Sequence, residues 1–320
     1  MRDNPIAQAV WLDLSGTMTE TIPISPFTGC GPQQIPNRVY SDNGLYLREM
    51  EAFFYKGHWC YVALECEIPN AGDYKATMIG ERPVIVVRDR DGSVNVLENR
   101  CAHKGAKFCQ KEFGNAKVFV CPYHQWGYRL NGELAGVPMK NGVGGQGGMD
   151  ADFKLEEHGL NRLKVQVHNG IVFASFDPDV EPFEQFIGSG LMPFFNRTFD
   201  GRKLTLLGYN RQRIRGNWKL MQENIKDPYH PGLLHVFFVT FGLWRADQKS
   251  ELRIDPRGRH AQMISTRNAG GENAEVTQGV TSFKQALKLE DPRLMDVVQE
   301  DWWQGPTAVM QTIFPSVIIQ

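Results

Sequence analysis

The sequence has little cysteine, almost no net charge and no long hydrophobic run. Six cysteines among 320 residues are too few for a disulfide scaffold, which favours a reducing compartment. A formal net charge of -1 argues against nucleic acid as a partner. No apolar run reaches the length of a membrane span, and the opening Met-Arg-Asp-Asn-Pro lacks the apolar core of a signal peptide. These absences predict a cytoplasmic protein without a nucleic-acid or membrane partner.

What is present predicts a globular chain with a β-rich first half. The hydrophobic content of 42% and the 320 residues suffice for two domains of ordinary size. Residues 1–45 are rich in Pro, Gly, Ser and Thr and suggest an irregular arm, and 46–56 resemble a short helix ended by Gly57. Strands are predicted at 61–64, 74–79, 83–88, 94–97 and 204–214, with hairpins around Asn131-Gly132 and Asn169-Gly170. Later segments predict helices at 283–289 and 293–298 and strands at 308–314 and 316–320.

Two short motifs contain paired cysteine and histidine residues. Cys101-Ala-His103 is followed after seventeen residues by Cys121-Pro-Tyr-His124. A [2Fe–2S] centre of the Rieske type takes two cysteines on one iron and two histidines on the other, and each arm here supplies one of each. Gly105 allows the backbone to come close to the sulfides, and Pro122 stiffens the second arm. A structural zinc ion would also accept this ligand set, so both metals remain open at this point, with the cluster favoured.

A second candidate metal site lies in the sequence Asp227-Pro-Tyr-His230-Pro-Gly-Leu-Leu-His235. Asn217 can cap a helix that runs to about Lys226, and the two prolines that follow would break it. Such a break can direct His230 and His235 at one point. Two histidines with a carboxylate leave open positions for dioxygen on ferrous iron. Spacing alone fits packing histidines better, but a nearby one-electron carrier favours the iron site.

These motifs, together with the Asn217-Trp218-Lys219 segment, resemble the large (α) subunit of Rieske-type aromatic-ring-hydroxylating oxygenases. The resemblance extends from about Tyr46 to Gln320. The segments 121–126, 221–235 and 312–320 are most similar to those of salicylate 5-hydroxylases, and terephthalate and anthranilate dioxygenases resemble the chain more distantly. The resemblance implies an α+β fold. An all-β Rieske [2Fe–2S] domain at 57–176 would be inserted in a helix-grip catalytic domain made of 1–56 and 177–320, with an antiparallel sheet.

The resemblance also implies roles for the residues of both sites. Cys101, His103, Cys121 and His124 would bind the [2Fe–2S] cluster, and His230 and His235 the mononuclear non-haem Fe(II). Asp227 matches the family's bridging aspartate, which would hydrogen-bond His230 and the cluster ligand His124 of a neighbouring subunit. Asn224 is a further candidate for the surroundings of the iron.

The chain departs from the family pattern at two points. The family's third iron ligand is an aspartate further downstream, and the sequence ends before that region. Asp247 and Asp255 match no ligand position, so either a fragment that lacks the third carboxylate or an incomplete metal site is expected. Lys104 stands where relatives often have Arg, which keeps the charge without the bidentate fork.

The reaction implied is hydroxylation of an aromatic acid with O2, salicylate to gentisate being the first choice. Electrons from NADH would arrive through a ferredoxin and its reductase, and an α3β3 or α3 oligomer, with or without a small β subunit, is expected. Arg245 and Gln320 are candidate anchors for the acid. The alternatives are a dioxygenase that makes a cis-diol from terephthalate, anthranilate or benzoate, and a non-catalytic electron carrier or zinc-binding protein.

Overall fold

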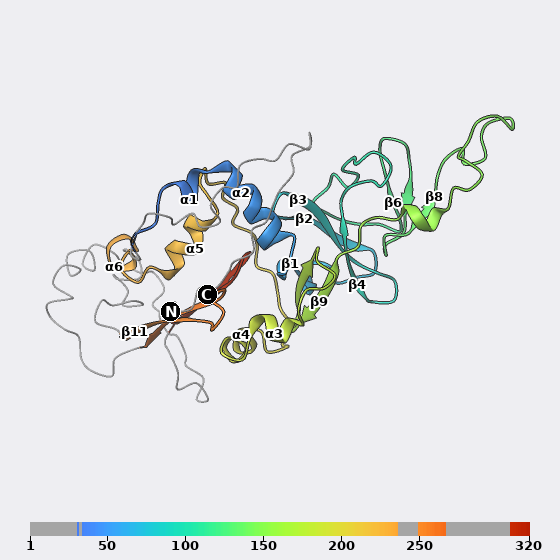
Figure 1. The fold of residues 1–320 in the computed structure, drawn as a ribbon. Helices are drawn as coiled ribbons and strands as arrows, with labels where there is room; N and C mark the ends of the chain where they lie inside the picture. The colour runs from blue at the N-terminus through green and yellow to red at the C-terminus, as the bar shows by residue number, and fades with distance from the viewer. Residues whose placement is uncertain (1–30, 32–33, 236–248, 267–307) are drawn as a thin grey trace, which may run out of the picture.

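The computed structural model describes residues 31, 34–235, 249–266 and 308–320. Within these ranges the strands form four antiparallel sheets, of which three make up a β-rich region at the centre and right of Figure 1 and one lies toward the left. The helices are α1 (Arg38–Ser41), α2 (Asn43–Glu49), α3 (Phe183–Ile187), α4 (Met192–Thr198), α5 (Lys219–Lys226) and α6 (Pro231–Leu234), and α2 continues as a π-helical turn over Met50–Phe54.

The largest sheet of the β-rich region has the order β4-β3-β2-β5. Its strands are β2 (Asp73–Ile79), β3 (Arg82–Arg88), β4 (Val94–Glu98) and β5 (Phe113–Asn115). The four consecutive residues Val84 to Val87 of β3 are all buried. A strand buried on both faces is apolar throughout, which explains the unbroken Val-Ile-Val-Val run and the central place of β3.

Two smaller sheets complete this region. β6 (Phe119–Val120), β7 (Gly127–Tyr128) and β8 (Leu134–Gly136) form the first, and the predicted turn at Gly132 (φ 89°) connects β7 to β8. β1 (Cys60–Leu64), β10 (Ile171–Ser175) and β9 (Lys164–His168) form the second. Asn169 and Gly170 both have positive φ between β9 and β10, as a tight hairpin turn requires.

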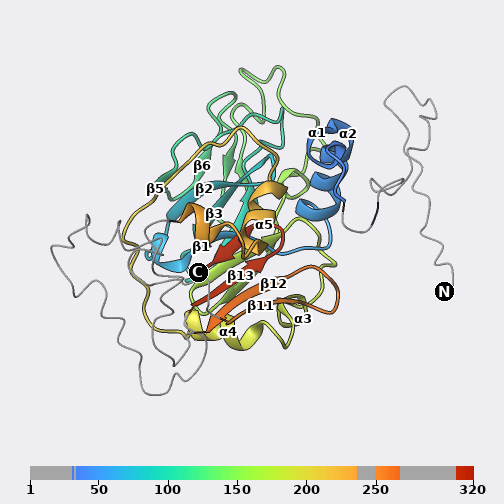
Figure 2. The same ribbon diagram turned by 90° about the vertical axis from the view of Figure 1, so that its left-hand side faces the viewer.

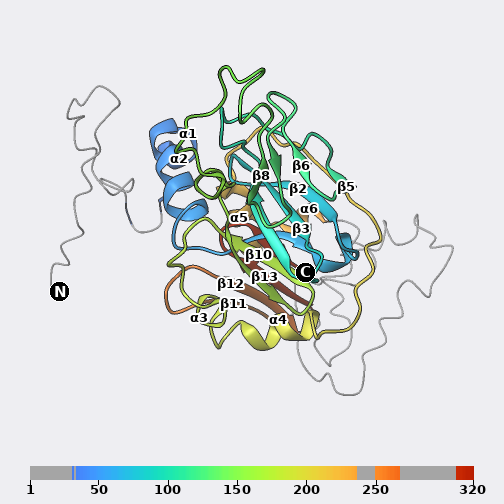
Figure 3. The same cartoon turned by 90° about the vertical axis from the view of Figure 1, so that its right-hand side faces the viewer.

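The fourth sheet has the order β11-β12-β13-β14 and lies against helices of the second half of the chain. Its strands are β11 (Lys249–Ile254), β12 (Ala261–Thr266), β13 (Ala308–Ile313) and β14 (Val317–Ile319). Ile313 and Ile319 pack with Phe183 and Phe186 of α3 in one apolar core. Helices α3 and α4 lie below this sheet in Figures 2 and 3, while α5 runs above it in Figure 2.

Most of the predicted elements are confirmed, and two predictions are wrong. Helical structure already begins at Arg38, inside the segment expected to be irregular. Residues 204–214, predicted as a strand, have no regular structure. Their alternating pattern finds no strand to pair with, and side chains attach the segment instead, since Tyr209 contacts Glu67 and Arg211 contacts Glu112. The helices predicted at 283–289 and 293–298 lie outside the described residues.

The described part of the chain contains no helix that is both long and apolar enough to cross a membrane. The pairing of β1 with β10 joins residues near 60 to residues near 175, close to both ends of the predicted Rieske domain. The boundaries 57–176, and the assignment of 1–56 and 177–320 to one catalytic domain, stay predictions.

Candidate metal centres

The first cysteine–histidine arm is a tight turn that leaves β4. Cys101 is buried, and its carbonyl oxygen accepts a hydrogen bond of 2.8 Å from the backbone N–H of Gly105. Gly105 has φ 70°, a conformation that glycine adopts without steric cost. The sequence prediction that a glycine is needed in this arm is explained by this turn.

The second arm leaves β6 in the same way. Cys121 is buried, and its carbonyl oxygen accepts from the backbone N–H of Gln125 at 2.9 Å. Trp126 is buried beneath the arm, and its indole ring stacks on the imidazole of His103 at 4.7 Å between ring centroids. The stacking holds the imidazole of the first arm over the second arm.

The two arms bring their histidines together at the surface and keep their cysteines inside. His103 Nδ1 lies 3.1 Å from His124 Nδ1, and His124 is exposed. Two nitrogens that bind one metal ion tetrahedrally at about 2.0–2.1 Å are separated by roughly 3.3 Å, so both Nδ1 atoms are placed for one ion. Desolvation, and then the neighbouring charges of His124 and Lys104, lower the pKa of His103 and favour the neutral form that binds metal.

This separation of ligand types distinguishes the two metals left open by the sequence. Among the described residues, which include both arms, no three His, Cys, Asp or Glu side chains converge closely enough to hold one metal ion. A zinc ion would draw all four ligands around one point, whereas a [2Fe–2S] cluster takes the thiolates on one iron and the imidazoles on the other. The arrangement therefore fits the cluster.

A buried tyrosine contacts this site and was not predicted from the sequence. The hydroxyl of Tyr128 lies 3.0 Å from Cys101 Sγ and accepts a hydrogen bond from the backbone N–H of Ala102 at 3.1 Å. Burial, and then the hydrogen bond to Cys101, raise the pKa of Tyr128, so the hydroxyl keeps its proton. With its oxygen already accepting from Ala102, the hydroxyl can donate this proton to the sulfur.

The second site lies at the two ends of α6, just after α5 ends, and the two prolines predict this break between the helices. The Asn217 side chain accepts from the backbone N–H of Lys219 at the start of α5, and Pro231 is the first residue of α6. Because the helix is interrupted, the imidazoles of His230 and His235 face each other with 3.1 Å between their Nε2 atoms. This spacing again suits two ligands of one ion.

Asp227 and Asn224 contact opposite nitrogens of the His230 imidazole. Asp227 lies behind His230, whose Nδ1 is 2.9 Å from the Asp227 carbonyl oxygen and 3.4 Å from its carboxylate. A proton on Nδ1 leaves Nε2 as a lone pair for metal. The Asn224 amide nitrogen lies on the open side, 3.3 Å from His230 Nε2. Asp227 is therefore placed to orient the His230 imidazole from its Nδ1 side, and it lies away from the Nε2 atoms that face each other.

No third ligand is found in the described part of the chain. Asp255 lies in the β11–β12 turn, where its carboxylate accepts hydrogen bonds from the backbone N–H groups of Arg259 and His260. Gln320 is exposed. Asp247 and Arg245 lie outside the described residues.

A buried ion pair fixes the start of α5, and sequence reasoning missed it. Lys219 Nζ lies 2.7 Å from Glu49 Oε2 on α2, and both side chains are largely buried. The indole N–H of Trp218 donates to the same oxygen at 3.1 Å. An acidic residue among the apolar positions of 46–56 was the signal available in the sequence.

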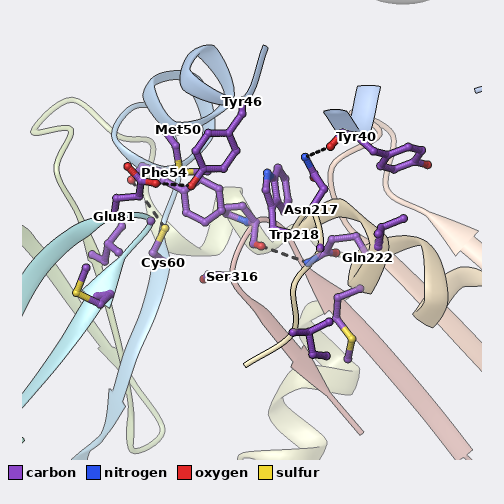
Figure 4. A pocket seen from close by; sticks show the side chains of 18 of the residues that line it. Tyr40, Tyr46, Met50, Phe54, Cys60, Glu81, Asn217, Trp218, Gln222 and Ser316 are labelled. Atoms are coloured by element: carbon purple, nitrogen blue, oxygen red, sulfur yellow. Dashed lines mark hydrogen bonds between the residues drawn. The ribbon is translucent and has the colours of Figure 1, made fainter. Parts of the chain in front are cut away.

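A cavity of about 1340 Å³ separates α2 from α5 and β14. Figure 4 shows Tyr46, Phe54, Trp218 and Gln222 around it. The Gln222 amide nitrogen donates to the Pro315 carbonyl at 3.2 Å, while its buried oxygen has no hydrogen-bond partner in the described residues. Asn224 also lines the cavity, which therefore reaches the helix beside the second histidine pair.

Comparison with known proteins agrees with this geometry. A sequence model of the Rieske [2Fe-2S] domain matches residues 58–147. The large oxygenase component of salicylate 5-hydroxylase from Ralstonia sp is 64% identical over 296 residues, which cover 91% of this chain and 70% of that protein. The anthranilate 1,2-dioxygenase large subunit of Burkholderia cepacia is 41% identical, with 90% and 68% covered. The crystal structure of naphthalene 1,2-dioxygenase from Rhodococcus sp. bound to indole superposes on this chain with a TM-score of 0.69 and 27% sequence identity. The superposition covers 88% of this chain and 63% of that chain.

The Rieske domain match and the geometry of the two cysteine–histidine arms define a Rieske iron–sulfur protein. A second pair of histidines lies elsewhere in the same chain. The chain belongs to the large (α) subunits of the Rieske-type aromatic-ring-hydroxylating oxygenases. It spans less than two thirds of the solved naphthalene dioxygenase chain. The resemblance and fold class expected from the sequence are confirmed, and the family requires a [2Fe–2S] cluster and a mononuclear non-haem iron.

Proposed function

We propose that this chain is the oxygenase component of an enzyme that hydroxylates salicylate to gentisate. The overall reaction is salicylate + O2 + NADH + H⁺ → gentisate + H2O + NAD⁺. The 64% identity to a salicylate 5-hydroxylase component supports this substrate. The two histidine pairs, each 3.1 Å apart and each beside groups that orient them, carry the proposal of an oxygenase.

The buried and the exposed cluster residues would bind different irons. Cys101 and Cys121 would hold the inner iron, and His103 and His124 the outer iron, next to solvent. His230 and His235 would hold the catalytic iron, with Asn224 beside them. When bound, the cluster supplies electrons one at a time and the ferrous ion offers open positions for O2.

Asp227 would connect the two centres across a boundary between subunits. Its carboxylate is 46% exposed and can accept a further hydrogen bond from outside the chain. The second histidine pair, which flanks α6, lies at the left of Figure 1, and the arm that follows β6 lies at the right, so the two sites of one chain are far apart. We infer that the exposed His124 of a second copy approaches Asp227.

The partners belong to the same proposal. A ferredoxin and a ferredoxin reductase would deliver the electrons of NADH, and an α3 or α3β3 assembly would place the sites of neighbouring copies together. A cytoplasmic location agrees with the reducing environment that free cysteines need.

Metal analysis and product analysis test the proposal together. The protein with its electron donors should contain about three irons per two sulfides and convert salicylate to gentisate with one oxygen atom from ¹⁸O2. His230→Ala should lose about one iron in three and all product, yet keep the cluster spectrum. His168→Ala removes a histidine that hydrogen-bonds Asn196 and packs against Phe183 and Phe195, and should keep all three irons.

Other results would point to the alternatives. A cis-diol that contains both atoms of ¹⁸O2 would identify a dioxygenase. Two irons with no turnover would indicate an electron carrier, and zinc without sulfide would refute the cluster.

A further inference from the structure

The two arms of the cluster site are built on the same backbone turn. In each arm the cysteine carbonyl accepts from the residue four positions later, Gly105 or Gln125, at 2.8 and 2.9 Å. In each arm the cysteine N–H donates to the residue five positions later, Ala106 or Trp126, at 2.9 Å. The same fold of the backbone therefore presents both pairs of ligands.

The two turns differ in the residue at the left-handed position. Gly105 occupies it in the first arm with φ 70°, and Gln125 occupies it in the second with φ 56°. A residue with a side chain is strained in this conformation, whereas glycine is not. Strain of this kind is found most often at functional sites.

Nothing inside the described chain uses the Gln125 side chain. The residue is exposed, and among the described residues its amide makes no hydrogen bond. It follows His124 directly, and the neighbouring Tyr123 is 66% exposed with its ring against the His124 imidazole. Exposed aromatic residues beside unpaired polar groups are typical of protein interfaces.

The surface around Asp227 has complementary features. The carboxylate is 46% exposed, and the next aromatic residue, Tyr229, is 76% exposed. A carboxylate accepts several hydrogen bonds, and a glutamine amide donates two. The contact would be head to tail, which can close a ring of identical subunits.

We propose that Gln125 is a positioning residue that holds the histidine edge of the cluster against the Asp227 surface of a second copy of this chain. The inference rests on the proposed function, because that function requires an electron to pass from His124 to a neighbouring Asp227. The amide contact would offset the strain of the turn in the assembled protein.

Two substitutions separate the side chain from the backbone. Gln125→Gly removes both the amide and the strain, so the unfolding temperature should rise by about 1 to 4 °C at a protein concentration that dissociates the copies. Gln125→Ala removes the amide and keeps the strain, so no such rise is expected. Both should slow oxidation of the reduced cluster in a single turnover with salicylate and O2 by about 2- to 10-fold, the value of one hydrogen bond. Both should weaken self-association by a similar factor, measured by sedimentation at low protein concentration.

Met139→Gly is the matched control. Met139 has φ 55° and is 71% exposed in the loop after β8, so the same substitution relieves a similar strain away from the arms. It should raise the unfolding temperature and leave both the transfer rate and the self-association unchanged.

Three results would overturn the inference. Gln125→Gly with unchanged transfer and association would show that the amide has no contact. Slower reduction of the cluster by a ferredoxin, with unchanged transfer to the iron, would assign Gln125 to an external donor. Equal losses in the Met139→Gly protein would attribute the effect to backbone flexibility. If the wild-type protein itself transfers no electron to its second site, the proposed function fails, and a Gln125 effect on association alone would still be measurable.

Discussion

Acid should weaken the packing of the β11–β14 sheet on α3 through one buried histidine. His260 is fully buried, with its Nε2 atom 2.7 Å from the Phe186 carbonyl. Its Nδ1 accepts from the backbone N–H of Phe314 at 3.2 Å. This pairing fixes the neutral tautomer, because a proton on Nδ1 would face another N–H group.

The size of the effect follows from the shift of the His260 pKa. Burial lowers this pKa from 6.5 to about 4, and the charges of Arg259 and Arg257 act in the same direction. The hydrogen bond to Phe186 and the charge of Asp255 act against it. Between pH 4 and 6.5 the unfolded chain binds a proton that the folded chain does not, so stability rises with pH in this range. The contribution is fully present above pH 6.5, and about 2 kcal/mol of it should be lost on going from pH 7 to pH 5.

Denaturant unfolding at a series of pH values measures this loss. His260→Gln cannot titrate, so its stability should depend less on pH between 5 and 7, by about 2 kcal/mol over that interval, whatever its absolute stability. The cluster histidines contribute equally to both proteins and cancel in the comparison. Identical pH slopes for the two proteins would refute the reasoning.

Three further predictions concern the neighbours of the two metal sites. Tyr128→Phe removes the hydroxyl beside Cys101 Sγ. Loss of this hydrogen bond to sulfur should lower the midpoint potential of the cluster by roughly 20 to 60 mV, measured in a redox titration followed by electron paramagnetic resonance. An unchanged potential would contradict a hydrogen bond donated by the tyrosine. Glu49→Gln leaves Lys219 buried without its partner and should lower the free energy of unfolding by about 3 kcal/mol. The double variant Glu49→Gln/Lys219→Met should recover much of this loss. Equal stability of the single and double variants would argue against an ion pair at the start of α5. Asp227→Asn should leave iron content and reduction of the cluster unchanged and slow product formation at least 10-fold, so a normal rate in this variant would remove Asp227 from the electron path.

The local patterns of the sequence predicted the turns that bring the candidate site residues together, because the information for a turn is local. A turn of five residues fixes Cys101 relative to His103, and two prolines fix the break before α6. The hairpins at Asn131-Gly132 and Asn169-Gly170 could be predicted because tight turns need positive φ values, which asparagine and glycine adopt readily. The strand expected at 204–214 was wrong, because alternation of side chains cannot tell whether a partner strand is available.

The identity and spacing of the candidate ligands were therefore determined by the sequence itself, since they depend on residue type and on turns a few residues long. Tertiary structure alone decided which nitrogen of each imidazole faces its partner, that Tyr128 lies against Cys101, and that Glu49 fixes the start of α5 from 170 residues away. It also decided that Gln125, an ordinary polar residue in the sequence, occupies a left-handed turn beside the cluster. These features are contacts between segments remote in the chain, or conformations imposed by packing. The interactions that stabilise them come from distant residues, so a short stretch of sequence cannot predict them.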